Sequence, residues 1–248
     1  MNLFLFAHQD DEYFVAPLLA EDPANARCVF LTMGDFHGTN CAVRNAESRR
    51  ALRSLGVTEE QVFFAGEKLR VPDNDLASHL PSVLAWLSDE CSGAETVFAP
   101  AYEGGHPDHD AACLLGYAFA ARAGGIPVLE FAAYRAHPWL PYYFEVMRRP
   151  KGTRMDAAAL PKACFSPKTF LLFRRYPSQW KTWLGLLPPL FFHYLAGGKT
   201  GIYRAANRDF RVRPHEGKLY YEYRGWSTFG RFLAQTESFR RDHLTAFA

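Results

Sequence analysis

Short apolar runs alternate with helix-like segments over the first 135 residues, and this alternation constrains the fold more than any other feature of the sequence. The runs have the length and composition of buried strands. Predicted strands occupy residues 2–6, 27–32, 62–65, 96–99 and 126–131, and predicted helices occupy residues 12–20, 43–55, 76–87 and 108–122. Such alternation is typical of βαβ units, whose parallel strands are joined by right-handed helical crossovers. We therefore expect an α/β fold with a Rossmann-like, mostly parallel sheet and helices on both faces.

The alternation weakens after residue 140. A loop is predicted over residues 150–161, partly helical structure over 168–183 and 228–239, and strands within 203–223, where charges and aromatics mix. A length of 248 residues suits one large domain. We expect residues 1–140 to form the core that carries the functional site. Residues 141–248 are expected to be a C-terminal α+β extension that completes this core and shapes the substrate cleft.

The composition excludes several classes of protein. Hydrophobic residues make up 48% of the chain and charged residues 22%, which allows a sizeable core and argues against disorder. A formal net charge of +2 is too small to favour nucleic-acid binding. The five cysteines are odd in number and show no CxxC spacing, so a disulfide framework is not expected and a cytoplasmic location is predicted.

Residues 183–197 form a long apolar stretch that contains Pro188 and Pro189. The stretch is too short for a transmembrane helix. Three interpretations remain open for it: a core segment, a wall facing the substrate, or a shallow contact with a membrane.

Two histidine-bearing acidic segments each come directly after a predicted strand. Residues 7–12 read AHQDDE, and residues 105–109 read GHPDH. Ligands of such sheets bind beyond the carboxyl ends of the strands, and both segments lie at those ends. The fold is therefore expected to bring them together in one pocket.

The two segments contain the donor atoms of a hydrolytic metal site. A catalytic zinc usually has three protein ligands and one open position, and imidazole nitrogen and carboxylate oxygen both suit it. His8 and Asp11 are three residues apart on the strand-to-helix turn, and His109 would complete the set. Asp10, between the first two, could take a proton from water. The same donors also suit Fe²⁺, Mn²⁺ or Co²⁺.

The remaining polar residues of these segments have several candidate roles. His106 could act as an acid or donate a hydrogen bond to an oxyanion, and Asp108 could hold an imidazole in one tautomer. Glu12 is expected only to favour the helix dipole. Taken singly, each histidine could be structural and each aspartate a helix cap. Their joint occurrence after two strands favours the metal site.

These two motifs closely resemble those of the GlcNAc-phosphatidylinositol deacetylase family, also called LmbE-like, which includes the deacetylases of mycothiol and bacillithiol synthesis. Further segments resemble family elements: LTMGD at 31–35, RNAE at 44–47 with LG at 55–56, PDNDL at 72–76, and YPSQ at 176–179. The resemblance covers residues 1–180. The two histidine-bearing motifs are its specific part, and the others support them.

The resemblance implies a role for each matching position. It implies zinc bound by three residues: His8, Asp11 and His109. It implies Asp10 as the general base, and His106, with Asp108 as its partner, as the residue that assists the tetrahedral intermediate or the leaving amine. It also implies that Arg44 and Asp73 contact the sugar or its substituent.

The sequence departs from the family at two positions. Gln9 stands where the family usually has proline, which is expected to affect only the turn. Gly104 stands where some sugar deacetylases have a tyrosine that helps at the oxyanion. Tyr102 or another residue could fill that role, or the role is absent.

The expected function is that of a zinc-dependent hydrolase. Its substrate would be an N-acetylated amino sugar or sugar conjugate of the N-acetylglucosamine type, from which it releases acetate, and a lipid-linked sugar is compatible with this expectation. Two alternatives stay open: an amidase for a larger thiol–sugar or other N-acyl conjugate, and a non-catalytic, metal-dependent carbohydrate-binding module. No nucleic-acid partner is expected, a peripheral membrane contact is compatible with the sequence, and the oligomeric state is not predicted.

Overall fold

A computed structural model describes residues 1–35, 38, 40–137, 143–149, 163–206 and 208–244. The described residues form a six-stranded sheet of order β3-β2-β1-β4-β5-β8, in which every pair is parallel except the last. Its strands are β1 (Asn2–Phe6), β2 (Ala26–Phe30), β3 (Val62–Phe64), β4 (Thr96–Pro100), β5 (Val128–Phe131) and β8 (Ile202–Tyr203). The five predicted strands are confirmed, and their ends shift by no more than two residues.

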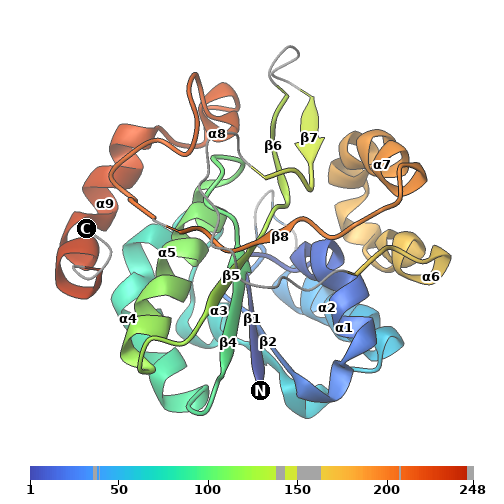
Figure 1. Cartoon of the computed structure of the whole chain (residues 1–248), viewed down its shortest axis with the longest axis horizontal. Coiled ribbons are helices and arrows are strands. Elements are labelled where there is room, and N and C mark those ends of the chain that lie inside the picture. The colour runs from blue at the N-terminus through green and yellow to red at the C-terminus, as the bar shows by residue number, and fades with distance from the viewer. Residues whose placement is uncertain (36–37, 39, 138–142, 150–162, 207, 245–248) are drawn as a thin grey trace.

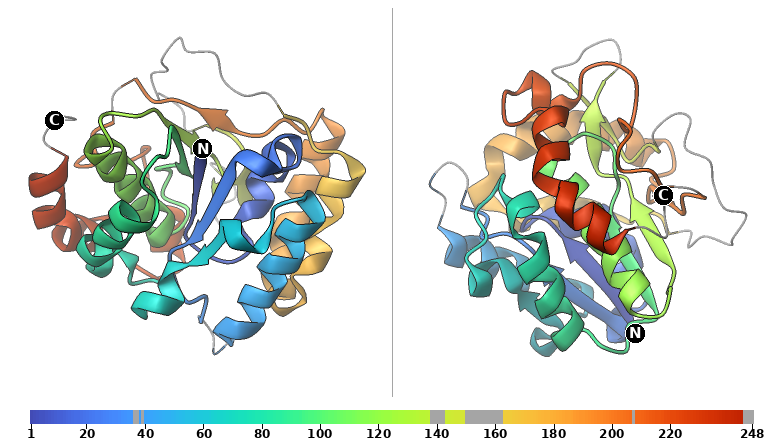
Figure 2. Two further views of the ribbon diagram at one scale, coloured as in Figure 1. Left: turned by 90° about the horizontal axis from the view of Figure 1, so that it is seen from below. Right: turned by 90° about the vertical axis from the view of Figure 1, so that its left-hand side faces the viewer.

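Helices cover both faces of this sheet (Figures 1 and 2). In the first half of the chain they are α1 (Ala16–Glu21), α2 (Cys41–Leu55), α3 (Ala65–Leu69), α4 (Leu76–Glu90) and α5 (Pro107–Arg122). In Figure 1, α4 and α5 lie on one side of the strands and α1 and α2 on the other. The expected Rossmann-like α/β fold with helices on both faces is therefore confirmed.

Alternation along β1 divides the core between these two layers. Leu3 and Leu5 are buried in a cluster with side chains of α4 and α5. Phe4 and Phe6 point the opposite way, into a cluster with side chains of α1 and α2. Successive side chains of a strand face opposite sides, so a strand that is apolar throughout must be covered on both.

One predicted helix differs in its first half. Residues 11–15 form a 3-10 turn (Asp11–Val15), and the α-helix begins only at Ala16. The positive φ of Asp10, 108°, starts this tight turn directly after the strand. A 3-10 turn advances the chain further per residue than an α-helix. Asp11 and Glu12, at the start of this turn, therefore lie ahead of the α-helix that begins at Ala16.

The C-terminal part adds a hairpin and further helices. They are the hairpin β6 (Tyr134–Ala136) and β7 (Phe144–Val146), and the helices α6 (Pro167–Phe170), α7 (Trp180–Leu195), α8 (Tyr220–Tyr223) and α9 (Phe229–His243). Helix α9 packs beside α4 and α5 (Figure 1). The expected α+β extension is confirmed. The boundary proposed at residue 140 and the loop predicted over 150–161 lie outside the described residues.

The prediction of strands within residues 203–223 is largely wrong. Within the described part of this range, named strand structure ends at Tyr203 and α8 begins at Tyr220. Pro214 and Gly217 fall between them, and side-chain contacts rather than a strand ladder hold the segment.

Glu130, buried on β5, joins the extension to the sheet. Its carboxylate accepts three hydrogen bonds from the Arg208 guanidinium, at 2.6–2.8 Å. It also accepts from the hydroxyls of Tyr117 and Tyr203. A buried carboxylate is stable only when its charge and lone pairs are satisfied, so the segment around Arg208 is tied to the core.

Among the described helices, none has both the length and the apolarity needed to cross a membrane. The apolar stretch 183–197 falls mainly in α7.

We propose that the two parts of the chain unfold together, and Arg208→Ala tests this. The substitution leaves the charge of Glu130 in the core without its Arg208 partner, so the free energy of unfolding should fall by about 3–5 kcal/mol. Denaturant unfolding should still show one transition. Arg211→Ala is the control, because Arg211 pairs with Asp209 at the surface, where a pair contributes about 0–1 kcal/mol. Equal losses in both variants would contradict the role of Glu130.

Candidate active site

The two histidine-bearing loops meet at the carboxyl ends of β1 and β4. These strands are neighbours, with Phe4 opposite Phe98, and the strand order reverses between them. β2 and β3 follow β1 on one side, and β5 lies on the far side of β4. In open α/β sheets such a reversal leaves a crevice above the strand ends, where ligands bind.

The first loop is held in shape by its own carboxylates. The backbone N–H of His8 donates to Asp11 Oδ2 at 2.8 Å. The N–H of Asp10 donates to Glu12 Oε2 at 2.9 Å. Glu12 is fully buried, and burial raises its pKa to about 7. Its expected role at the helix dipole alone is therefore wrong: it also fixes the turn that presents Asp10.

The second loop is pinned where α5 begins. Asp110 Oδ1 accepts from the N–H groups of Glu103 and Gly104, at 3.1 and 3.0 Å. The N–H of Asp108 donates to His106 Nδ1 at 3.2 Å. A lone pair on Nδ1 places the proton of the neutral ring on Nε2, so His106 can donate only through Nε2.

His8, Asp11 and His109 converge as predicted. Their ligand atoms all lie within 4.8 Å of one another, and all three side chains are buried. His109 Nε2 lies 3.1 Å from Asp11 Oδ1. Its Nδ1 is buried and has no hydrogen-bond partner among the described residues. Two imidazoles and a carboxylate, with a ring nitrogen left unsatisfied, fit a divalent metal such as zinc.

Asp108 contacts a different histidine from the one that the sequence suggested. His8 Nε2 donates to Asp108 Oδ2 at 3.1 Å, whereas His106 Nδ1 is 3.7 Å from that oxygen. The carboxylate also accepts from the N–H groups of Asn74 and Leu76. It therefore sets the tautomer of His8 and leaves His8 Nδ1 on the side of Asp11, as carboxylates behind metal-binding histidines do.

Arg44 and Asp73 both line the cavity beside Asp10. Arg44 is buried rather than a solvated helix charge, and its guanidinium lies 3.3 Å from Asp10 and 3.5 Å from Asp73. It also donates to the carbonyls of Gln9 and Gly34. Arg44 therefore supports the turn that carries Asp10, in addition to facing the cavity.

The charges around the metal-ligand set are unbalanced toward carboxylates. Burial acts to lower the pKa of His8, but Asp108, Asp73 and Asp11 outweigh it and raise that pKa to about 9. Burial raises the pKa of Asp10 against the opposing effect of Arg44. A group of acids this dense favours a cation among them.

His106 behaves differently from His8. Burial, together with the neighbouring His8 and His109, lowers the pKa of His106 well below its usual value. His106 is therefore a neutral hydrogen-bond donor at neutral pH, in keeping with the proton on Nε2.

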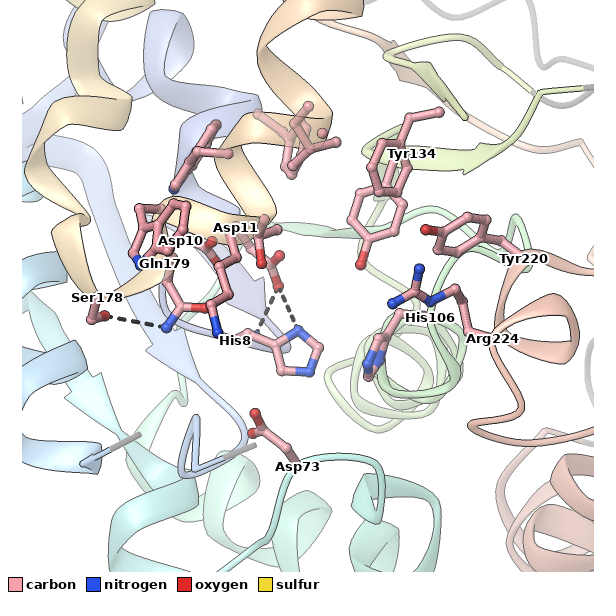
Figure 3. Close-up of a pocket in the computed structure, with 18 of the residues that line it drawn as sticks. His8, Asp10, Asp11, Asp73, His106, Tyr134, Ser178, Gln179, Tyr220 and Arg224 are labelled. Atoms are coloured by element: carbon pink, nitrogen blue, oxygen red, sulfur yellow. Dashed lines mark hydrogen bonds and ion pairs between the residues drawn. The ribbon is translucent and has the colours of Figure 1, made fainter. Parts of the chain in front are cut away.

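A cavity of about 810 Å³ opens above these residues. Figure 3 shows His8, Asp10, Asp11, Asp73 and His106 at its inner end. Its other walls come mostly from the extension and include Tyr134, Phe144, Ser178, Gln179, Trp180, Trp183, Tyr220, Arg224 and Trp226. Most of these wall residues were missed by sequence reasoning, because they come from segments far apart in the chain.

Tyr134, not Tyr102, is a tyrosine that lies against the metal-ligand candidates. The hydroxyl of Tyr102 donates to the carbonyls of Phe210 and Val212, away from the cavity lining. Tyr134 lines the cavity, its ring centroid lies 5.3 Å from that of His109, and its hydroxyl points between Asp11 and His106 in Figure 3. Its position just after β5, at the same edge of the sheet, was the available signal.

Comparison with protein families matches residues 3–120 to the GlcNAc-PI de-N-acetylase (PIG-L) family. This stretch of the chain is a PIG-L domain. Its deacetylase family and the resemblance seen in the sequence therefore agree. Among curated proteins, no sequence matches the chain.

Several solved structures share this fold, and two of the following three are deacetylases. One is a deacetylase of the teicoplanin biosynthesis pathway, with a TM-score of 0.58 and 16% identity over 84% of this chain and 99% of that one. The A40926 pseudoaglycone deacetylase Dbv21 has a TM-score of 0.54 and 17% identity over 87% of this chain and 98% of its own. The conserved protein TT1542 of Thermus thermophilus has a TM-score of 0.55 and 18% identity over 83% of this chain and 94% of its own.

Two supporting elements of the PIG-L resemblance are in direct contact. Glu47, in the RNAE segment of α2, accepts from the backbone N–H of Ser178 at 2.9 Å and from its hydroxyl at 2.6 Å. Ser178 and Gln179 belong to the YPSQ segment and line the cavity. The PIG-L domain thus anchors a wall that lies outside the matched residues.

Gln9 does more than alter the turn. Its amide nitrogen donates to Asn45 Oδ1 at 2.7 Å and to the carbonyl of Thr32 at 3.3 Å. A side chain at position 9 therefore links the metal-binding turn to α2 and to the end of β2, which proline could not do.

The buried carboxyl group of Glu103 is expected to make the stability of the protein depend on pH. Burial raises its pKa from 4.5 to about 8, with Arg135 opposing. Between these values the folded state keeps a proton that the unfolded state releases, so the free energy of unfolding should fall as pH rises, by at most about 1.4 kcal/mol per pH unit from this group. Denaturant midpoints across pH 5–8 measure it. Glu103→Gln should flatten the slope, and an unchanged slope would assign it to other acids.

Proposed function

We propose that this protein is a zinc-dependent N-deacetylase that removes the acetyl group of an N-acetylated amino sugar or sugar conjugate and releases acetate. The observation that carries the proposal is the buried convergence of His8, Asp11 and His109, with the carboxylate of Asp10 beside them at the inner end of one cavity. The PIG-L domain supports hydrolysis of an acetamide, because its family consists of deacetylases.

His8, Asp11 and His109 would hold the metal. Bound zinc would supply Lewis acidity, which lowers the pKa of water and polarises a carbonyl. Asp108 orients His8, and the buried turn around Asp10 fixes Asp11. The positions of these two ligands are thereby set by hydrogen bonds within the protein.

Asp10 is the proposed general base. Its carboxylate faces the cavity and is held by the Arg44 guanidinium at 3.3 Å. Burial raises its pKa, which makes the carboxylate a better proton acceptor for water as the water attacks the acetamide carbon. Asp10 would then return that proton to the departing amine.

His106 is the proposed donor to the oxyanion. Nε2–H is the only N–H group of its neutral ring, and the depressed pKa of His106 keeps the ring neutral. A fixed neutral N–H directed at developing charge stabilises the transition state without a proton transfer. The hydroxyl of Tyr134, beside His106 in Figure 3, is placed to donate a second hydrogen bond.

The cavity favours a substrate larger than a single small amide. Its volume falls within the ~300–1,000 Å³ of small-molecule sites, and Trp180, Tyr220 and Trp226 provide flat surfaces against which sugar rings can pack. Asp73 lies near the inner end, where its carboxylate can accept from a sugar hydroxyl. One solved relative in fold is described as a deacetylase–teicoplanin complex, which supports a glycoconjugate substrate here.

Replacement of Asp10 separates catalysis from metal binding. Asp10→Asn keeps the shape of the side chain but removes its basicity, so kcat for acetate release should fall by about 10²–10⁴-fold. Zinc content, measured by atomic absorption, should stay near one per chain. Asp89→Asn, on the exposed side of α4, is the matched control and should keep full activity. Near-native turnover in Asp10→Asn would refute the assignment of the base.

Removal of the metal tests the ligand set and distinguishes an enzyme from a non-catalytic carbohydrate-binding module. Dialysis against a chelator should abolish acetate release from a panel of N-acetylated amino sugars, and added zinc should restore it. His109→Ala should lose both zinc and activity, because one of three ligands is gone. Sugar binding without acetate release at any metal loading would instead favour the non-catalytic carbohydrate-binding module.

A further inference from the structure

We propose that α7 and the basic segment before it form a docking surface for an anionic lipid membrane. The surface has two parts. The apolar stripe consists of the exposed residues Trp180, Leu184, Phe191, Phe192 and Leu195 on α7. The basic rim consists of Lys168, Arg174, Arg175 and Lys181. This proposal does not depend on the proposed function.

The apolar stripe is unusual for a surface helix. Its five side chains are between 47% and 70% exposed, and they are five of the nine exposed large apolar residues of the described chain. Trp180, Leu184, Phe191 and Leu195 follow one another at intervals of four or seven residues, which aligns them along one side of the helix, and Phe192 lies beside this row. The opposite side buries Trp183, Leu186 and Leu190 in the core. Helix α7 is thus apolar on both sides, and only one side is covered within the described structure.

All Lys, Arg, Asp and Glu residues in the part of the sequence that contains α7 are basic. No Asp or Glu occurs between Asp156 and Asp209. Lys168, Arg174, Arg175 and Lys181 are exposed, and none of them forms an ion pair with a described carboxylate. Each cation near an anionic bilayer contributes about 1 kcal/mol of attraction. An apolar stripe beside a cationic rim is the pattern of helices that lie in a membrane interface.

A hollow in the basic rim offers a place for a lipid phosphate. Lys168, Arg174 and Arg175 line it together with Ser54 and the exposed Leu171, and its volume is about 480 Å³. The segment that carries these cations packs on α7, because the ring of Phe170 stacks on Tyr194 with centroids 4.5 Å apart. The hollow and the apolar stripe therefore belong to one packed unit, beside each other in Figure 1 as α6 and α7.

The chemistry favours a membrane over a second copy of the chain. A two-fold contact between two apolar stripes would bring the basic rims of both copies together, and like charges oppose each other. An anionic bilayer satisfies both parts at once, with acyl chains against the stripe and phosphates against the cations. At 1.5 Å per residue, 16 residues span about 24 Å, so α7 would lie along the interface rather than cross it.

Docking would also determine which surroundings the mouth of the cavity faces. Trp180 belongs to the apolar stripe and Lys181 to the basic rim, and both line the cavity. The cavity mouth would therefore adjoin the lipid surface, and a glycoconjugate held in the membrane could enter from there.

Vesicle sedimentation with the whole chain tests the proposal. Vesicles are made of phosphatidylcholine alone or with about a quarter phosphatidylglycerol, an anionic lipid. The protein should bind the anionic vesicles at least about tenfold more tightly. Phe192→Ser/Leu195→Ser and Lys168→Glu/Arg175→Glu should each weaken that binding by about tenfold or more. Val212→Ser and Arg122→Glu, exposed elsewhere, are the matched controls and should bind like the unsubstituted protein.

The outcomes separate the alternatives. Thermal unfolding midpoints equal to that of the unsubstituted chain show that a variant is folded. Absence of vesicle binding, or binding that both double variants retain in full, overturns the proposal. A dimer that Phe192→Ser/Leu195→Ser converts to a monomer, without vesicle binding, overturns it in favour of self-association. Acetate release from a soluble substrate is measured in parallel: its absence with vesicle binding intact refutes the proposed function and leaves the docking surface standing.

Discussion

The reversal of strand order between β1 and β4 is the constraint on which the site depends. The parallel strands are added outward from this point in opposite directions along the sheet, so no crossover helix covers the space above the ends of β1 and β4. The loop after β1 and the loop after β4 can therefore face each other over about a hundred residues of intervening chain. His8 and Asp11 come from one loop and His109 from the other, and neither loop alone supplies three ligands.

This placement concentrates acid, and the rest of the structure compensates for it. Asp10, Asp11, Asp73 and Asp108 lie within one small region, and Arg44 places a permanent positive charge among them. A buried carboxylate is costly unless it is paired or hydrogen-bonded. Backbone N–H groups satisfy Asp11 and Asp108, while Arg44 serves Asp10 and Asp73. The remaining negative charge is what makes a divalent cation favourable here.

The local sequence pattern was enough to predict the parallel strands of the sheet and to predict that the metal-ligand candidates lie close together. Apolar runs read as strands because a strand buried on both faces must be apolar at every position, as β1 is. The contact of Asp108 with His8 was not predictable, since it depends on how two loops settle against each other to within about an ångström. Arg224 was missed for a related reason: it reaches the cavity from a segment that lacks a regular pattern, and only tertiary packing brings it there.

Helix α7 shows why apolarity alone did not choose between a core segment, a cavity wall and a membrane contact. Hydrophobic periodicity tells one face of a helix from the other only when the second face is polar. In α7 the buried Trp183 and Leu186 and the exposed Leu184 and Phe192 are equally apolar. The fold assigns different roles to different sides of one helix, since Trp183 and Leu186 are core residues that also border the cavity while Leu184 and Phe192 face outward. A helix that is shared in this way couples the cavity mouth directly to whatever covers its outer face.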